Sequence, residues 1–154
     1  MRNLIFKIIN FLIKLQFPEV EKIDTETLSQ WQGDTSKIQP LLFDARTESE
    51  YIVSHLKTAI PIDLTRKDFY DTLISTNTPI VVYCSVGYRS AIVAEKLQKA
   101  GFSQVFNLSG GIFEWANEQR PMFQLISDEL HLTTSVHPYN ATWGRLLRIP
   151  NRSR

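Results

Sequence analysis

Residues 79–90 read PIVVYCSVGYRS, and the rest of the sequence can be interpreted outward from this segment. Ile80 to Tyr83 form a short apolar run rich in β-branched residues, which predicts a buried strand. Residues 90–100 have the pattern of a helix, and Gly101 follows them as a typical residue just beyond a helix end. Cys84, the only cysteine among 154 residues, therefore lies on a strand-to-helix turn.

This turn has features that favour an ionised sulfur and an anionic substrate. The start of the next helix presents unpaired N–H groups and a partial positive charge. Backbone N–H groups from Ser85 to Ser90 can form an anion-binding nest, and Gly87 permits positive φ if the loop requires it. Arg89 can place a guanidinium group beside a bound anion. The alternative is that Cys84 is a small buried hydrophobic residue, but its position favours the functional interpretation.

Strand and helix patterns alternate along the chain. We expect strands at 41–44, 80–83 and 105–108, a short extended piece at 59–61, and helices at 25–32, 48–55, 68–74, 90–100 and 112–118. Such alternation predicts an α/β layered domain with parallel strand pairing. Sites in these sheets form at the carboxyl ends of strands, so we expect Asp44, Cys84 and residues 109–111 to converge on one edge.

Composition and charge limit the function classes. The chain is 43% hydrophobic and 21% charged, as an ordinary globular protein is. One cysteine excludes an internal disulfide framework and a cysteine-rich zinc site, and we expect a cytoplasmic location. The net charge is +1, but residues 18–129 carry 10 basic and 16 acidic residues, so only the two ends of the chain are basic. Because nucleic-acid binding needs a basic face on the folded body, we expect no nucleic-acid partner.

Residues 1–17 predict an amphipathic helix. Asn3, Lys7, Asn10 and Lys14 lie on one narrow helical stripe, and most of the other side chains are Leu, Ile or Phe. The segment is too short to span a bilayer and lacks a clear signal-peptide cleavage site. Two alternatives remain: the helix packs on its own domain or on a partner subunit, or it lies on a membrane surface.

Several separated segments together indicate a family. They are Leu42-Phe43-Asp44-Ala45-Arg46, Glu50-Tyr51, Ser54-His55-Leu56, Ala59-Ile60-Pro61, Val82 to Ser90, and Leu108-Ser109-Gly110-Gly111 with Trp115. In this order and spacing they resemble the rhodanese homology domain. The resemblance covers roughly residues 20–120 and leaves an N-terminal helix at 1–17 and a C-terminal extension at 121–154.

The resemblance implies a three-layer fold, with a central, mostly parallel sheet and helices on both faces. It also implies a sulfurtransferase, in which Cys84 takes a sulfane sulfur from a donor as a persulfide and passes it to a thiol or protein acceptor. The implied substrate-binding residues are Ser85, Val86, Gly87, Tyr88, Arg89 and Ser90. Neither a metal nor a cofactor is implied. The alternative function is a non-catalytic binding or scaffold module with the same fold.

The length and charge of the loop narrow this chemistry. Four residues separate Cys84 from Arg89. In cysteine phosphatases five residues separate the cysteine from the arginine, and this longer loop suits a larger oxyanion. Arg89 is the only charged side chain in the loop, while rhodaneses that favour thiosulfate tend to carry extra basic groups there. We therefore expect thiosulfate to be a poor donor, and a persulfide on a small thiol or a protein is an equally possible one.

Other residues have two interpretations each. Asp44 and Arg46 either support the site or form a structural ion pair with a neighbouring segment. In the first case Asp44 orients Arg89 or a loop amide, and Arg46 attracts an anion. We expect His55 to be a hydrogen-bonded core residue. The remaining expectations are structural: Gly110-Gly111 allows close backbone packing, Trp115 lies in the core, and residues 150–154 are frayed.

Overall fold

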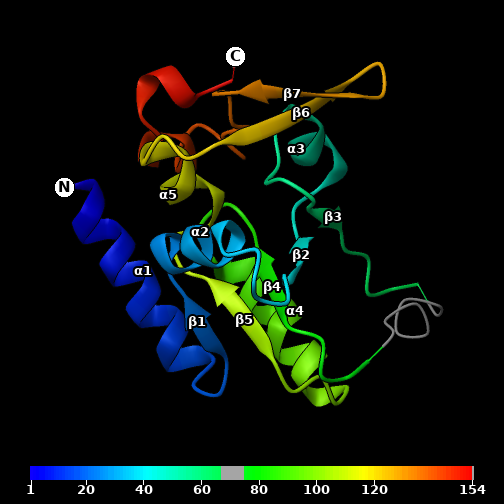
Figure 1. The fold of residues 1–154 in the computed structure, drawn as a ribbon. Coiled ribbons are helices and arrows are strands. Elements are labelled where there is room, and N and C mark those ends of the chain that lie inside the picture. Colours follow the sequence, from blue (N-terminus) through cyan, green and yellow to red (C-terminus); the bar gives the residue numbers. More distant parts are fainter. Residues whose placement is uncertain (67–74, 154) are drawn as a thin grey trace.

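A five-stranded parallel sheet forms the centre of the protein in a computed structural model, which describes residues 1–66 and 75–153 (Figure 1). Its strands lie in the order β1-β5-β4-β2-β3, and every pairing within it is parallel. The strands are β1 (Glu21–Ile23), β2 (Leu41–Asp44), β3 (Ile60–Pro61), β4 (Ile80–Tyr83) and β5 (Val105–Leu108). The predicted α/β fold with a parallel sheet is confirmed.

The central strand β4 contributes side chains to two separate cores. All four of its residues are buried, as expected for a strand covered on both faces. Successive side chains of a strand point to opposite faces, so Val81 and Tyr83 belong to one hydrophobic cluster and Ile80 and Val82 to the other.

Helices cover both faces of this sheet and complete the three layers (Figure 1). On one face α4 packs Ala91, Ala94 and Leu97 against Ile80 and Val82. On the other face α2 and α5 pack with Val81 and Tyr83. The helices are α1 (Arg2–Gln16), α2 (Thr25–Gly33), α3 (Glu48–Val53), α4 (Tyr88–Lys99) and α5 (Gly111–Asn117).

Most predicted elements are present, and the differences have local causes. The strand β1 was not predicted, because its residues Glu-Lys-Ile contain neither an apolar run nor an alternating pattern. Helix α3 ends at Val53 rather than at His55, because Ser54 is extended and His55 pairs with Phe123. Helix α4 begins two residues earlier than expected, directly after Gly87 turns the chain. The predicted helix at 68–74 lies outside the described residues.

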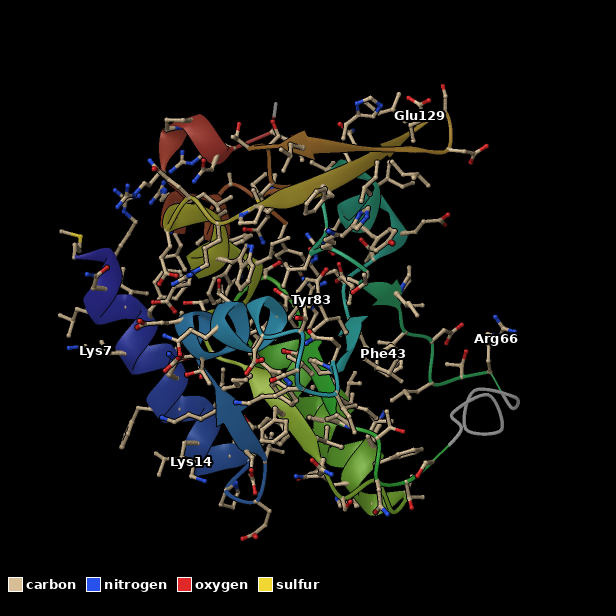
Figure 2. All side chains as sticks on the ribbon, viewed as in Figure 1. Lys7, Lys14, Phe43, Arg66, Tyr83 and Glu129 are labelled. Atoms are coloured by element: carbon tan, nitrogen blue, oxygen red, sulfur yellow. The ribbon has the colours of Figure 1, made fainter. Side chains whose placement is uncertain are left out.

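Helix α1 runs along the edge of the domain beside β1 (Figure 1). Its inner face packs on its own domain, because Phe6 joins one core cluster and Ile13 the other. Its outer face is exposed, and Lys7 extends away from the domain (Figure 2). The expectation that the helix packs on its own domain is therefore confirmed for one face. None of the helices that the structure describes is both long and apolar enough to cross a bilayer.

The C-terminal extension is ordered around an antiparallel hairpin. Its elements are β6 (Met122–Ile126), β7 (Glu129–Thr133) and two 3₁₀ helices, η2 (Trp143–Leu146) and η3 (Ile149–Asn151). The prediction that residues 150–154 fray is wrong for residues up to Ser153. The Val136 N–H donates to the Asn151 carbonyl (2.7 Å), and the Ser153 N–H donates to the Val136 carbonyl (2.9 Å).

Candidate active site

Cys84 directly follows the central strand β4 and lies buried in the turn before α4, with 1% of its surface exposed. Its Sγ accepts a hydrogen bond from the Gly87 N–H (3.2 Å) and lies 3.4 Å from the Ser90 hydroxyl oxygen. Gly87 is the N-cap of α4 with φ of +107°, so its positive φ turns this amide toward the sulfur. The strand-to-helix turn and the positive φ expected at Gly87 are confirmed.

A buried hydrogen-bond network fixes the far side of the loop. The Asn107 side-chain N–H donates to the Gly87 carbonyl (2.9 Å), which leaves the Asn107 oxygen facing the Ser90 hydroxyl at 2.6 Å. Ser90 and Asn107 are both buried, so the network holds the hydroxyl close to Sγ. Sequence analysis did not identify Asn107, which reads as an ordinary strand residue of β5.

Backbone hydrogen bonds join helix α5 to the cysteine loop. The Ile112 N–H donates to the Cys84 carbonyl (2.9 Å), and the Phe113 N–H donates to the Ser85 carbonyl (3.1 Å). A Cβ atom on Gly111 would lie 2.3 Å from the Cys84 carbonyl oxygen, so only glycine allows this approach. The expected close packing at Gly110-Gly111 is confirmed, and so is the convergence of the Cys84 turn with residues 109–111.

Arg89 is held by a carboxylate that sequence analysis did not assign. Its two terminal nitrogens donate to the two oxygens of Glu50 at 2.9 and 2.8 Å, and the second nitrogen also donates to the Ser85 hydroxyl at 3.0 Å. Burial works against the charge on Glu50, but hydrogen bonds from Arg89 and Thr47 outweigh it and lower the pKa of Glu50 to about 2. Glu50 is therefore ionised, and it balances the charge of Arg89.

The local sequence around Glu50 contains one signal of its role. Thr47 caps α3 and receives the Glu50 N–H, while the Glu50 carboxylate accepts the Thr47 N–H at 3.0 Å, which is a capping box. The spacing of Thr47 and Glu50 predicts that cap. It does not predict Arg89 as a partner, since 39 residues separate the two side chains.

Asp44 and Arg46 have the structural role that was one of their two interpretations, but they pair with each other rather than with a neighbouring segment. Arg46 donates to both carboxylate oxygens of Asp44, with a shortest distance of 2.6 Å, and also to the Ser54 carbonyl. Both side chains are buried, and neither lines the cavity next to Cys84. The expectation that Asp44 orients Arg89 is corrected, because Glu50 occupies that position.

Two further predictions concern core residues. His55 is buried, stacks on the Tyr51 ring at 4.1 Å and lies 3.2 Å from the Tyr51 carbonyl, and burial lowers its pKa. Trp115 is buried, and its indole N–H donates to the Pro121 carbonyl. Both residues lie in the core, as expected.

A cavity of about 500 Å³ opens above Cys84. The loop forms its floor, and α1 forms one wall with Ile9, Leu12, Ile13 and Gln16. The opposite wall comes from the C-terminal extension. The residues lining that wall are Tyr139 and Trp143.

Each wall of the cavity contacts the cysteine loop directly. Gln16 donates to the Tyr88 hydroxyl (3.1 Å), and Phe17 meets the Tyr88 ring edge-on with 6.0 Å between ring centres. Tyr139 lies against the Arg89 guanidinium, 4.8 Å from its central carbon. Sequence analysis did not predict either wall, because nothing local in 1–17 or 121–154 indicates the loop as their contact.

The cysteine loop contains the candidate nucleophile, and no metal cluster accompanies it. Among the residues that the structure describes, no group of three or more His, Cys, Asp or Glu side chains could hold a metal ion. The arrangement combines a buried thiol, an N–H donor, a nearby hydroxyl and a neutralised guanidinium. It suits nucleophilic chemistry at sulfur.

Comparisons with known proteins agree with this geometry. The model of the family described as "Rhodanese-like domain" matches residues 24–118. A sulfurtransferase of Allochromatium vinosum is 33% identical over 67% of this chain and 94% of that protein. Thiosulfate sulfurtransferase GlpE of Coxiella burnetii is 29% identical over 49% of this chain and 70% of that protein. The match to adenylyltransferase and sulfurtransferase uba4 of Ogataea parapolymorpha, 26% identical over 73% of this chain, spans only 28% of that longer protein.

Solved structures show the same fold. The rhodanese-like domain of an Anabaena protein superposes with a TM-score of 0.60 over 70% of this chain and 82% of that chain, at 21% identity. Thiosulfate sulfurtransferase from Pseudomonas aeruginosa superposes with a TM-score of 0.64 over 82% of this chain and 24% of that longer chain, at 18% identity. With a family match over more than half of its length, the chain belongs to the rhodanese-like domain family, among relatives named as sulfurtransferases.

Proposed function

We propose that this protein is a sulfurtransferase that moves a sulfane sulfur from a donor to a thiophilic acceptor through a persulfide on Cys84. The observation that carries the proposal is the position of the Cys84 sulfur at the cavity floor, with the Gly87 N–H and the Ser90 hydroxyl beside it. The names of its relatives as sulfurtransferases support the same activity.

The reaction has two half-steps. The Cys84 thiolate attacks the sulfane sulfur of the donor, a Cys–S–S bond forms, and the donor leaves with the electron pair of its broken S–S bond. Thiosulfate leaves as sulfite and a persulfide leaves as its thiolate. An acceptor thiolate then attacks the terminal sulfur, and the Cys84 thiolate departs. Since Cys84 is the only cysteine in the chain, the acceptor is a separate molecule, and ping-pong kinetics are expected.

Loop groups have separate roles in this mechanism. The Gly87 N–H stabilises negative charge on sulfur, as preorganised donors do in other nucleophilic sites. The Ser90 hydroxyl donates its one hydrogen to Asn107 in this structure, and its rotation toward the sulfur adds a second donor when the thiolate forms. Glu50 and Ser85 hold Arg89 in place at the cavity floor. Val86 and Tyr88 line the floor of the cavity.

Intact mass spectrometry tests the proposal. The protein is incubated with thiosulfate, with a polysulfide and with glutathione persulfide, and its mass is measured before and after addition of a thiol acceptor. We expect a gain of one sulfur atom that the acceptor removes, and no gain in Cys84→Ser. If no donor adds sulfur to the wild-type protein, the non-catalytic binding or scaffold function is the better description.

A further inference from the structure

The cavity above Cys84 is almost uncharged. Arg89 is the only charged residue among those that line it in the part of the chain that the structure describes. Both of its terminal nitrogens donate to the Glu50 carboxylate, so its charge is already balanced by an ion pair. A dianion such as thiosulfate finds no unpaired cation on this floor, and anion recognition depends on such groups.

The size and lining of the cavity also exceed what a small inorganic donor needs. A volume of about 500 Å³ lies within the range of sites that hold drug-sized organic ligands. Ile9, Leu12 and Ile13 present aliphatic surface on one side, and Trp143 and Tyr139 present aromatic rings on the other. An apolar group is stabilised in such a site by roughly 25 cal/mol for each Å² removed from water.

Both walls lie outside the part of the chain that matches the family. The matched residues are 24–118, whereas the walls belong to α1 and to the C-terminal extension. The walls are nevertheless fixed to the loop, by Gln16 on Tyr88 and by Tyr139 on Arg89. The sulfur chemistry therefore belongs to the common domain and the apolar cavity to the added segments.

We infer that the sulfur substrate of this protein is an organic thiol, or its persulfide, with an aromatic or alkyl group. That group occupies the cavity between α1 and the C-terminal extension. This inference rests on the proposed function. The reacting sulfur enters toward Cys84, while the aromatic or alkyl group contacts the Leu12 and Trp143 walls.

Two thiosulfonates with the same reacting group test the inference. Benzenethiosulfonate and methanethiosulfonate each transfer the terminal sulfur to the Cys84 thiolate: the Cys–S–S bond forms, the S–S bond to the sulfonyl group breaks, and a sulfinate leaves with the electron pair. They differ only in the apolar body. Rates of sulfur gain on Cys84 are measured by intact mass, and each is divided by the rate of the same reagent with free glutathione.

The normalised efficiency is expected to favour the benzene compound by at least about tenfold, the lower end of what a hydrophobic pocket discriminates. Equal normalised efficiencies would overturn the inference and leave the sulfurtransferase proposal standing. No sulfur gain from either reagent, or from thiosulfate, would overturn the proposed function itself.

Matched variants locate the selectivity on the wall. Leu12 and Leu15 are both on α1 and are 56% and 64% exposed, but only Leu12 lines the cavity. Neither substitution removes a core residue, so both variants should fold. We expect Leu12→Gln to reduce the benzene preference several-fold and Leu15→Gln to retain it. A preference that survives both Leu12→Gln and Trp143→Ala would contradict the assignment of this cavity.

A second inference rests on the outer face of α1, which the cavity does not use. Leu4, Ile8, Phe11 and Leu15 are 50–64% exposed there. Exposed apolar residues gathered on one helix face mark an interaction surface. Residues 1–17 carry Arg2, Lys7 and Lys14 and no acidic residue.

We propose that this face docks on an anionic lipid surface. Apolar side chains enter the interface while the basic ones meet the headgroups, which is the charge arrangement of interfacial helices. A second copy of the chain fits less well, because paired outer faces of α1 would bring their lysines together.

Vesicle co-sedimentation tests this docking surface. The full chain should co-sediment with vesicles containing phosphatidylglycerol, much less with phosphatidylcholine alone, and less as salt rises. The double variant Leu4→Gln/Phe11→Gln should remain in solution. A control pair of exposed leucines on the β6–β7 hairpin, Leu125→Gln/Leu132→Gln, should still bind. If both double variants still bind the vesicles, the proposal is overturned. If the α1 variant instead disrupts a dimer, the face belongs to an interface with a second copy of the chain.

Discussion

The floor and the walls of the Cys84 cavity differ in almost every physical respect. The floor is held by two polar networks, one of Ser85, Arg89 and Glu50 and the other of Ser90 and Asn107. The walls are aliphatic and aromatic, and part of their surface is exposed. A polar network of this kind tolerates little change, whereas an apolar wall can be altered with small structural cost. Variants of the floor should therefore affect the reaction and the fold together, and variants of the walls should affect only selectivity.

The largest effect is expected where the floor meets α5. Gly111→Ala places a Cβ atom 2.3 Å from the Cys84 carbonyl oxygen at a backbone φ of +57°. We expect a loss of several kcal/mol in unfolding free energy and no detectable sulfur gain on Cys84. Chemical unfolding and intact mass measure the two effects.

The control for this glycine is Gly33→Ala. Gly33 ends α2, and an added Cβ there meets nothing within 4 Å. The control should be neutral or slightly stabilising. A Gly111→Ala protein as stable and active as the wild type would contradict the close approach of the two backbones.

A smaller loss of stability, together with a change in donor selectivity, is expected at the Glu50–Arg89 pair. Glu50→Gln removes the carboxylate that balances Arg89 and should cost about 2 kcal/mol, since hydrogen bonds to charged groups contribute this much. The unpaired guanidinium should also raise the use of thiosulfate relative to benzenethiosulfonate. A higher ratio of thiosulfate efficiency to benzenethiosulfonate efficiency would show that the floor has become an anion-binding site.

Glu95→Gln is the control for the charge change. Glu95 pairs with Lys99 on an exposed face of α4, and such pairs contribute little. It should change neither stability nor the donor ratio. A donor ratio that is the same in Glu50→Gln as in the wild type would show that Arg89 does not meet the substrate.

The same carboxylate predicts a pH dependence of stability. The folded-state pKa of Glu50 is lowered from 4.5 to about 2, so the unfolded chain binds a proton first as the pH falls. The stabilisation is complete above about pH 4.5 and is lost as the pH falls toward 2. Urea unfolding at several pH values in this window should show a smaller decline for Glu50→Gln than for the wild type. Identical declines would contradict the ionised pair.

The smallest of these effects is expected at Ser90, which contributes one hydroxyl. Ser90→Ala removes the group 3.4 Å from the sulfur and leaves the Asn107 oxygen without its donor. We expect the rate of sulfur gain to fall by up to about tenfold, with a modest loss of stability. Ser103→Ala, on the exposed surface, should leave the rate unchanged. An unchanged rate in Ser90→Ala would remove this hydroxyl from the mechanism.

The contrast between floor and walls also explains what could be predicted from the sequence. The strand, turn and helix around Cys84 are adjacent in sequence, so the periodic pattern of 79–100 and the glycine at 87 were sufficient to predict them. The parallel sheet followed from alternation of strands and helices. Gly111 was predicted to allow a close approach, although its partner, the Cys84 carbonyl, was not identified.

The missed contacts all join distant segments. The Glu50–Arg89 pair spans 39 residues, and the Gln16–Tyr88 hydrogen bond spans 72. Local patterns predict which residues share an element, but only tertiary packing decides which elements meet. Asp44 differs from these cases: its position at the end of β2 was predicted correctly, and its partner Arg46 is only two residues away.

Helix α1 takes part in both proposed binding surfaces, because Leu12 lines the cavity while Leu4, Phe11 and Leu15 form its exposed outer face. A helix that serves two sites links their equilibria thermodynamically. Any factor by which a docked α1 strengthens the binding of a cavity ligand must equal the factor by which that ligand strengthens docking. Measuring vesicle affinity with and without a cavity ligand therefore reports the coupling without any assay of turnover.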